Sequence, residues 1–519
     1  MLLEKELKFD AVPSDVLPDL NAVVKGATIG PSVAEQLSAT YWDTADLALA
    51  RWGVTLRFRV GDGESDWTLK LPTANDGGGT IVRREFRFPG VHEAVPADAR
   101  EALLAYTRRK DLQRVAYLDT RRTTRSVLLD GAAVAVLCDD DVHGKTDGGT
   151  ADVRQTDFRE IEVELVDSGR TQVLKAIRHR LRQAGFRSEG DPLAKVFRIL
   201  GDAALGRPDV VKRKRKRKTD VGDAISACLA ASVVQLIESH AGTRLGGDIE
   251  DLHEFRVATR RLRSDLRTFH RLLDADWTAL LRAELRWLGD EVGAVRDLDV
   301  LHVGLADAVE DMLEDDRSTG TRLVALVELE RATARDRLMT ALSSTRYLTL
   351  LDMLVEAAAA PKLAVPPETV EEQTGQVIAE LVRKPWKRLR RAANGLTRES
   401  TDEDLHAVRI LAKHCRYGAE AAIPFDGHRA EPFAKAMKEL QEVLGNYNDS
   451  VVMESWLRQH AGADPSLGFV AGALCARQTQ RRQELRKTMP KLIRKINKPK
   501  LTEWMKRNMS RTLRPVGFL

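Results

Sequence analysis

The sequence is poor in cysteine and in aromatic residues, and it contains no long apolar run. Its 519 residues include four cysteines and no Cys-x-x-Cys pair, which excludes a cysteine-built metal site and indicates a reducing, cytoplasmic setting. No run approaches the roughly 18 apolar residues of a membrane span, and charges from the fourth residue onward are untypical of a secretory signal. Aromatic residues amount to 5%, so few are available to stack on nucleic-acid bases.

Charge, by contrast, is plentiful and unevenly placed. Charged residues make up 31% of the chain, above the roughly 25% of an average globular protein. The net charge of +5 combines +12 over residues 471–519 and +6 over residues 211–220 with −3 over residues 1–210 and −10 over residues 221–470. Focused basic zones on an otherwise acidic chain indicate polyanionic partners.

Two kinds of hydrophobic periodicity divide the chain. Residues 1–205 contain period-two segments typical of antiparallel strands, with helices near 96–109 and 171–185. Residues 206–220 form a basic linker. Residues 221–510 show the 3.6-residue period of helices, with Pro385 among the prolines expected to end one. We therefore predict an α+β multidomain protein with an antiparallel β domain followed by an all-α domain.

The helical half contains an internal repeat. His253-x2-Arg256-x3-Arg260-x2-Arg263 recurs as His406-x2-Arg409-x3-Lys413-x2-Arg416, at an offset of 153. A second block, Val292–Asp297, recurs as Leu444–Asp449 at an offset of 152. Two ordered blocks at nearly one offset predict two related helical bundles, over about residues 221–360 and 368–510.

The predicted strands separate charges by sign. Alternate residues share one face of a strand, so Glu4 faces with Glu6, and Glu162 with Glu164, whereas other strands present Arg57, Arg59 and Lys70. An ordinary sheet with a solvated face is the alternative. Clustered carboxylates suit Mg2+ or Mn2+, and facing cations suit a phosphate chain, above all when the strands close into a barrel.

These strands resemble the CYTH domain, that is, the triphosphate tunnel metalloenzymes. Glu4-x-Glu6-x-Lys8 is similar to the family's ExExK signature, and the later motifs follow in the family's order: Leu56–Arg59, Thr68–Lys70, Arg83–Glu85, Arg121–Arg122, Asp139–Asp141, Glu160–Glu164 and Lys195. The resemblance covers about residues 1–203. It implies a tunnel of eight antiparallel strands that cleaves triphosphates with a divalent metal.

The resemblance also implies residue roles. Glu4, Glu6 and Lys8 would be catalytic. The metal would be held by Glu4, Glu6, Glu162 and Glu164, with Asp139 and Asp141 as further candidates. Arg87 departs from the pattern, because many relatives carry an acid there. The triphosphate would be held by Lys8, Arg57, Arg59, Lys70, Arg83, Arg121, Arg122 and Lys195.

The repeated helices carry stripes of cations. At 100° per residue, an arc of about 80° contains His253, Arg256, Arg260, Arg263, Arg267 and Arg271. Phe255 and Leu262 lie opposite this arc, on the core side. A solvated charged face is the alternative, but such faces usually contain ion pairs three or four residues apart. Arg256, Arg260 and Arg263 have no acid at those spacings, which favours an anion-binding stripe.

These helices resemble the CHAD domain over about residues 221–510. That resemblance implies two pseudo-symmetric four-helix bundles that bind inorganic polyphosphate, in some relatives on polyphosphate granules. The implied binding residues are His253, Arg256, Arg260, Arg261, Arg263, Arg267, Arg296, His406, Arg409, Lys413 and Arg416.

Together the two halves predict an enzyme that hydrolyses inorganic triphosphate with Mg2+ or Mn2+ and binds long-chain polyphosphate. Its expected location is the cytoplasm, with polyphosphate granules as a possible site of association. Alternatives are a non-catalytic polyphosphate-binding or granule protein, and a tunnel enzyme acting on thiamine triphosphate or cyclising ATP. We expect no membrane partner. Nucleic acid is a possible but unfavoured partner, and the sequence leaves the oligomeric state open.

Overall fold

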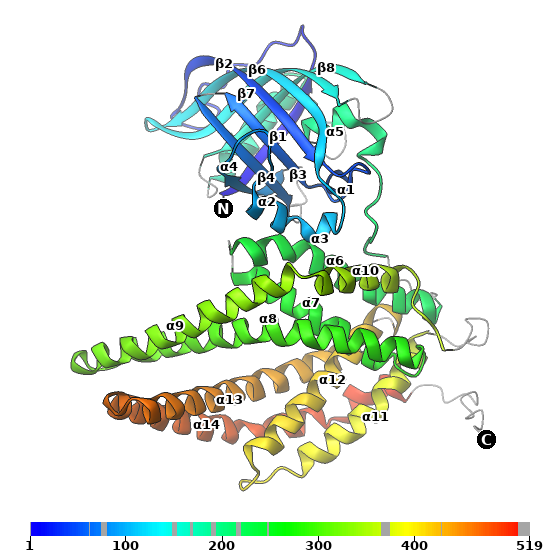
Figure 1. Cartoon of the computed structure of the whole chain (residues 1–519), viewed down its shortest axis with the longest axis vertical. Coiled ribbons are helices and arrows are strands. Elements are labelled where there is room, and N and C mark those ends of the chain that lie inside the picture. The colour runs from blue at the N-terminus through cyan, green and yellow to red at the C-terminus, as the bar shows by residue number, and fades with distance from the viewer. Residues whose placement is uncertain are drawn as a thin grey trace. The chain divides into compact units, whose positions relative to one another are not determined.

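The computed structural model describes residues 2–61, 63–73, 80–147, 153–166, 170–187, 194–213, 220–246, 249–364, 374–426 and 428–506. The chain divides into two units, Met1–Asp209 and Val210–Leu519, each drawn in Figure 1. The division falls within the predicted basic linker, residues 206–220, of which 214–219 lie outside the described residues.

Eight antiparallel strands close into a barrel in the first unit, which confirms the predicted fold. Their order around the barrel is β1-β5-β4-β3-β2-β6-β7-β8. Because β1 pairs with both β5 and β8, the sheet closes on itself. The strands are β1 (Leu2–Ala11), β2 (Ala27–Asp43), β3 (Thr55–Gly61), β4 (Glu64–Pro72), β5 (Ile81–Phe88), β6 (Gln113–Leu129), β7 (Ala132–Thr146) and β8 (Gln155–Leu165).

One apolar core of this unit lies outside the barrel wall. Leu7 and Ile161 point outward and pack against Ile177 of helix α4 (Thr171–Gln183). Val142, by contrast, lies on the inner face of β7, paired with lumen residue Thr120, and it packs against Ile199 of helix α5 (Lys195–Leu200). The unit also contains α1 (Ala48–Arg51), α2 (Ala97–Ala102), α3 (Leu104–Thr107) and the 3-10 helix η1 (Gly201–Ala203). Because strand residues alternate, the outward core leaves other inner positions free for charged side chains.

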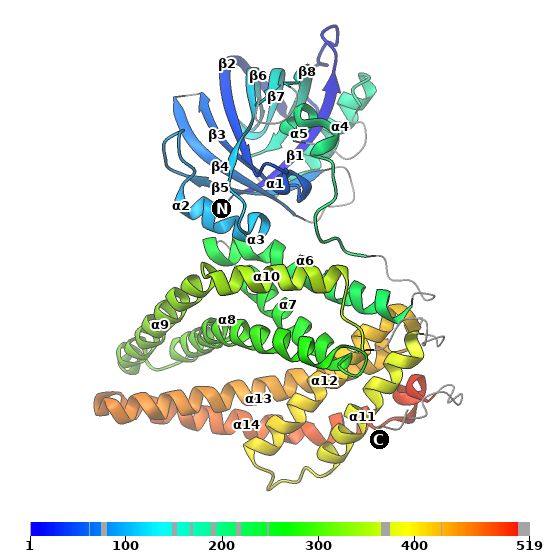
Figure 2. The same cartoon turned by 45° about the vertical axis from the view of Figure 1, so that its right-hand side comes forward.

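The second unit repeats one helical arrangement, as predicted. Two long hairpins, α8–α9 and α13–α14, lie side by side in Figures 1 and 2 and share one apolar core. The first copy comprises α6 (Val221–Leu245), α7 (Ile249–Thr268), α8 (Ala275–Glu310), α9 (Glu314–Leu342) and α10 (Thr345–Ala359). The second comprises α11 (Thr374–Asn394), α12 (Asp402–Asp426), α13 (Glu431–Ala463), α14 (Gly468–Ile496) and the 3-10 helix η4 (Pro499–Met505).

One helix of this unit is apolar enough to resemble a membrane span. The mean hydropathy of α6 reaches 1.5 over an 18-residue window, and 72% of that window is buried inside the unit. Its length and composition therefore also suit the core helix of a packed bundle.

The expected helix break at Pro385 is wrong, because α11 continues through this residue. An interior proline costs a helix one hydrogen bond and introduces a steric clash. Trp386 and Leu389, which follow it, are buried at 7% and 0% exposure. Tertiary packing of this apolar face offsets the local cost.

Candidate active site and anion-binding groove

Charged side chains line the lumen of the barrel. Glu4, Glu6 and Lys8 point inward together because they occupy alternate positions on β1. The other predicted residues that line the same cavity are Arg57, Arg59, Lys70, Arg83, Arg122, Glu162, Glu164 and Lys195. The structure therefore brings together most of the predicted site, and the roles of these residues stay predictions.

Three carboxylates converge on one side of the lumen. One oxygen from each of Glu4, Glu6 and Glu164 lies within 4.8 Å of the others, since Glu6 pairs with Glu164 across β1 and β8. Oε1 of Glu6 is buried and has no hydrogen-bond partner in the part of the chain that the structure describes. Burial and the neighbouring Glu162 and Glu4 raise the pKa of Glu164 to about 7. Three hard oxygens that repel one another fit a divalent cation such as Mg2+ or Mn2+.

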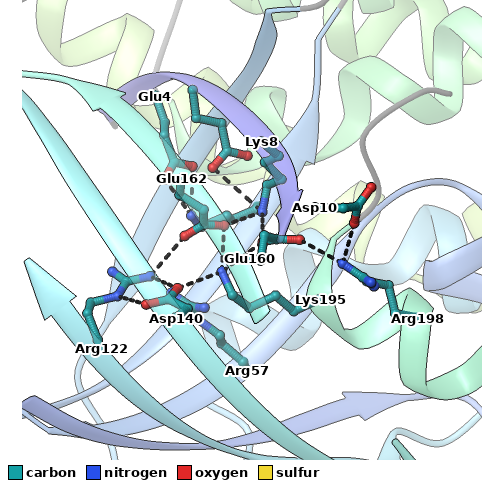
Figure 3. Close-up of polar contacts among 12 residues, drawn as sticks. Glu4, Lys8, Asp10, Arg57, Arg122, Asp140, Glu160, Glu162, Lys195 and Arg198 are labelled. Carbon is teal, nitrogen blue, oxygen red and sulfur yellow. Dashed lines mark hydrogen bonds and ion pairs between the residues drawn. The ribbon is translucent and has the colours of Figure 1, made fainter. Parts of the chain in front are cut away.

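A second cluster contains both signs of charge. Figure 3 shows Lys8 and Lys195 pointing toward Glu160 and Glu162. Nζ of Lys195 lies 2.6 Å from Glu162 and 3.1 Å from Glu160, and Lys8 also donates to both carboxylates. Although burial opposes charge, Lys195 and Lys8 hold the pKa of Glu162 well below its usual range. These carboxylates therefore keep two buried ammonium groups charged inside the lumen.

Arg122 and Asp140 belong to the same cluster. The guanidinium of Arg122 donates to both oxygens of Asp140, at 2.8 and 2.7 Å, and to Glu162 at 2.9 Å. Lys195 lies 3.0 Å from Asp140. Each cation thus contacts several acids. Phosphate oxygens can therefore replace some of these contacts while every cation keeps a negatively charged partner.

A third group lies where β1, β4 and β5 meet. Lys70 donates to both oxygens of Glu4, at 2.7 and 2.6 Å, and lies 3.2 Å from Glu85. Arg87 donates to Glu85 at 2.8 Å. Burial opposes the charged form of Glu85, but Lys70 and Arg87 lower its pKa to about 2. Arg87, the departure noted in the sequence, therefore faces the lumen and neutralises an acid there.

Three predicted lumen residues lie elsewhere. Arg122 pairs with Asp140 across β6 and β7, so Asp140 points inward, and alternation turns Asp139 and Asp141 to the outer side. Asp139 accepts two hydrogen bonds from Arg159, and Asp141 is exposed. Arg121 is exposed for the same reason. The predictions that place Asp139, Asp141 and Arg121 in the tunnel are wrong.

Sequence reasoning also missed residues of the lumen. Asp140 stands in a run of three aspartates whose inward member no local pattern identifies. Glu85 lies two residues after Arg83 on the same strand face, and that spacing could have indicated it. The hydroxyl of Tyr41 accepts a hydrogen bond from Arg57 at 3.4 Å. Because Tyr41 is uncharged, the pattern of charged residues did not indicate it.

The two cationic stripes of the helical unit face a common groove. It is lined by Arg256, Arg260, Arg263 and Arg267 of α7, by Lys413, His414 and Tyr417 of α12, and by Asp290 and Asp297 of α8. Nε of Arg260 is buried without a hydrogen-bond partner among the described residues, and so is Nε of Arg409, a predicted binding residue of α12 that is not part of this lining. Burial and the neighbouring Arg409 and Arg260 lower the pKa of Lys413 to about 7. Arg256 forms an ion pair with Asp297 at 2.9 Å, whereas Arg263, Arg267 and Lys413 form no ion pair within the described part of the chain.

Other predicted binding residues lie outside that groove lining. Arg261 and Arg416 form ion pairs with Glu420, at 3.3 and 2.7 Å. Nδ1 of His406 lies 3.0 Å from Oδ1 of Asn448, in a separate small pocket. His253 and Arg296 are half-buried and are not part of the groove lining.

Comparison with known proteins agrees with this architecture. The family models named CYTH domain and CHAD domain match residues 2–197 and 227–458. The chain is 30% identical over 518 residues to the uncharacterized protein Rv2226 of Mycobacterium tuberculosis, covering 96% of each. It belongs to the family that joins these two domains, and its barrel is that of a triphosphate tunnel metalloenzyme. Such enzymes act on triphosphates with divalent metals.

Two solved structures show partial similarity. The crystal structure of the CHAD domain from the plant Ricinus communis is 25% identical, covers 55% of this chain and 95% of its own, and gives a TM-score of 0.45. HpAC1 of Hippeastrum, described as a candidate adenylyl cyclase with a dominant triphosphatase activity, is 18% identical. It covers 38% of this chain and 95% of its own, with a TM-score of 0.24.

Proposed function

We propose that the barrel hydrolyses inorganic triphosphate with Mg2+ or Mn2+ and that the helical unit binds inorganic polyphosphate. The observation that carries the proposal is a closed lumen in which three converging carboxylates stand beside a wall of cations. A divalent ion held by Glu4, Glu6 and Glu164 would neutralise phosphate charge and supply a polarised water.

The chain's own residues supply binding and electrostatic stabilisation. Lys8, Lys195 and Arg122 keep their charge in a buried lumen because acids surround them, so they are preorganised to hold phosphoryl oxygens. Arg57 and Arg83 extend this cationic lining. Charge developing on the transferred phosphoryl group would thus meet fixed cations rather than mobile water.

The groove of the helical unit fits a thin, unbranched polyanion. Its cations lie along two packed helices, and its Arg260 has a buried Nε without a partner among the described residues, as does Arg409 on the predicted stripe of α12. A polyphosphate chain offers acceptor oxygens along its whole length and needs no stacking surface. The proposed setting is the cytoplasm, including polyphosphate granules, where the groove would keep the enzyme close to its substrate.

The test is phosphate release from tripolyphosphate by the full chain, with Mg2+ or Mn2+ and with EDTA. We expect metal-dependent release, and Glu4→Gln with Glu6→Gln should lower it by about 100-fold or more, because the variant removes two of three metal-binding charges. Glu93→Gln, which changes an exposed loop residue, is the matched control and should leave turnover unchanged.

The result also separates the alternatives. Release of a nucleotide product from ATP would indicate that the tunnel acts on organic triphosphates instead. No release with either metal, alongside retained polyphosphate binding, would make the protein a non-catalytic binder. Unchanged turnover in the double Gln variant would refute the proposed metal site.

A further inference from the structure

A second cationic surface lies on the outer face of α11. Lys384, Lys387, Arg388, Arg390 and Arg391 are exposed, and we call these five residues the α11 patch. No acid occurs between Glu380 and Glu399. No ion pair involves these five side chains within the described part of the chain. The patch is therefore a concentrated and uncompensated positive charge.

The internal repeat provides a comparison within the molecule. α11 and α6 both precede the histidine-containing helix of their repeat, and their first residues are separated by the same 153 positions. Yet α6 contains one cation, Arg244, beside two acids. Packing of the bundle therefore does not require cations at these positions, since the other copy folds without them.

Packing holds a second basic segment next to the patch. Trp386 of α11 contacts Phe433 edge to face, and Phe433 contacts Trp504 of η4. Asn497 at the end of α14 donates to Asn394 at 2.7 Å. Residues 485–502, which lead from α14 into η4, contain no acid and expose Lys491, Arg494 and Lys498. The α11 patch and the basic segment 485–502 are thus held together by the aromatic contacts of Trp386, Phe433 and Trp504.

In the first repeat, comparable exposed arginines are neutralised. Arg337 pairs with Glu291 at 3.4 Å, and Arg346 pairs with Glu284 at 2.6 Å. Evenly balanced charge is the usual state of a solvated helix face. The five exposed cations of the α11 patch depart from that balance, as expected for an interaction surface.

We propose that the α11 patch binds the phosphate backbone of duplex nucleic acid without sequence preference. A duplex presents one phosphate charge per about 1.7 Å of its axis, so it offers a dense row of anions to five exposed cations. Exposed lysines and arginines on an outer helix face can reach such phosphates. The only aromatic residue of α11, Trp386, is buried, so a single strand would find no stacking surface there.

The test uses the full chain and a short fluorescein-labelled DNA duplex over a range of salt concentrations. Lys384→Gln, Lys387→Gln, Arg388→Gln and Arg391→Gln, combined, should weaken duplex binding by more than about tenfold and lower the salt slope by up to about 3.6, because each of four phosphate contacts contributes roughly 0.9. Glutamine keeps helix propensity. Binding of long-chain polyphosphate should change little.

A matched control removes four exposed arginines that already form ion pairs. Combined Arg322→Gln, Arg337→Gln, Arg346→Gln and Arg458→Gln removes the same formal charge, and it should leave duplex binding nearly unchanged. The proposal fails if the native chain does not bind the duplex, if the control weakens binding as much as the patch variant, or if a single strand binds as tightly. Equal loss of polyphosphate binding would instead make the patch part of the polyphosphate surface and would also overturn it.

Discussion

Asp140 is the residue on which the inner charge network of the barrel depends. It is 0% exposed, accepts two hydrogen bonds from Arg122 and lies 3.0 Å from Lys195. Asp140→Asn should lower the free energy of unfolding of the barrel by about 3 kcal/mol, because two buried cations lose a counter-charge. Urea unfolding followed by tryptophan fluorescence measures this change. The neighbouring exposed Asp141→Asn should change it by less than about 0.5 kcal/mol, and equal effects would contradict the register of β7.

Lys413 makes the pH dependence of the groove predictable. Burial and nearby arginines place the pKa of Lys413 at about 7 in the free groove, so the amine is neutral above that pH. A bound polyanion favours the ammonium form and raises this pKa. Binding therefore takes up a proton above pH 7, and affinity should fall as pH rises, by at most about tenfold per unit. In the free groove, Asp297 is the acid that opposes the lowering of the Lys413 pKa. The pKa of His414 is about 4, so its imidazole stays neutral between pH 6 and 9.

The measurement is the dissociation constant of long-chain polyphosphate between pH 6 and 9, where the chain's interior phosphates do not titrate. Lys413→Gln should bind more weakly at pH 6 and lose most of the decline above pH 7. A native profile that is flat across this range would show that Lys413 does not change its charge on binding.

Among the elements, α5 depends on one glycine for its position. A Cβ on Gly144 of β7 would lie 2.0 Å from Cδ1 and 2.5 Å from Cγ1 of Ile199. Because α5 begins at Lys195, moving the helix also moves this amine away from Glu162. Gly144→Ala should raise KM for triphosphate by about tenfold through this displacement. Steady-state kinetics measure it, and Ile199→Ala in the same chain should recover most of the loss. Failure of that double variant to recover would place the defect in the strand itself.

The same elements show how far sequence reasoning reaches. Alternation in Glu4-x-Glu6-x-Lys8 predicted an inward face correctly, because a strand has only two faces. Alternation alone did not decide which aspartates of the run Asp139–Asp141 face the lumen, because the run has members on both faces of β7. The register of β7 against β6 decides it, since Asp140 pairs with the inward-facing Arg122. The helical period predicted the stripe on α7. The meeting of that stripe with Lys413 of α12 is a tertiary contact that no local pattern contains.

At the scale of the whole molecule, binding and turnover should be separable. The barrel packs its core around Ile161 and Ile177, and the helical unit packs its own around Leu305 and Leu474. A substitution in the groove therefore does not disturb the packing of the tunnel. Arg260→Gln with Arg409→Gln should weaken polyphosphate binding by about tenfold or more, since each guanidinium has a buried Nε without a partner among the described residues.

The same variant distinguishes a holding role for the groove from direct participation in catalysis. Tripolyphosphate is short enough to enter the tunnel unaided, so its kcat and KM should stay at native values. Long chains depend on capture, so their hydrolysis at low concentration should fall in proportion to the lost affinity and recover at saturation. Arg337→Gln with Arg346→Gln, whose arginines are paired with Glu291 and Glu284, should alter neither substrate. A lower kcat for tripolyphosphate in the groove variant would instead mean that the helical unit acts on the chemical step.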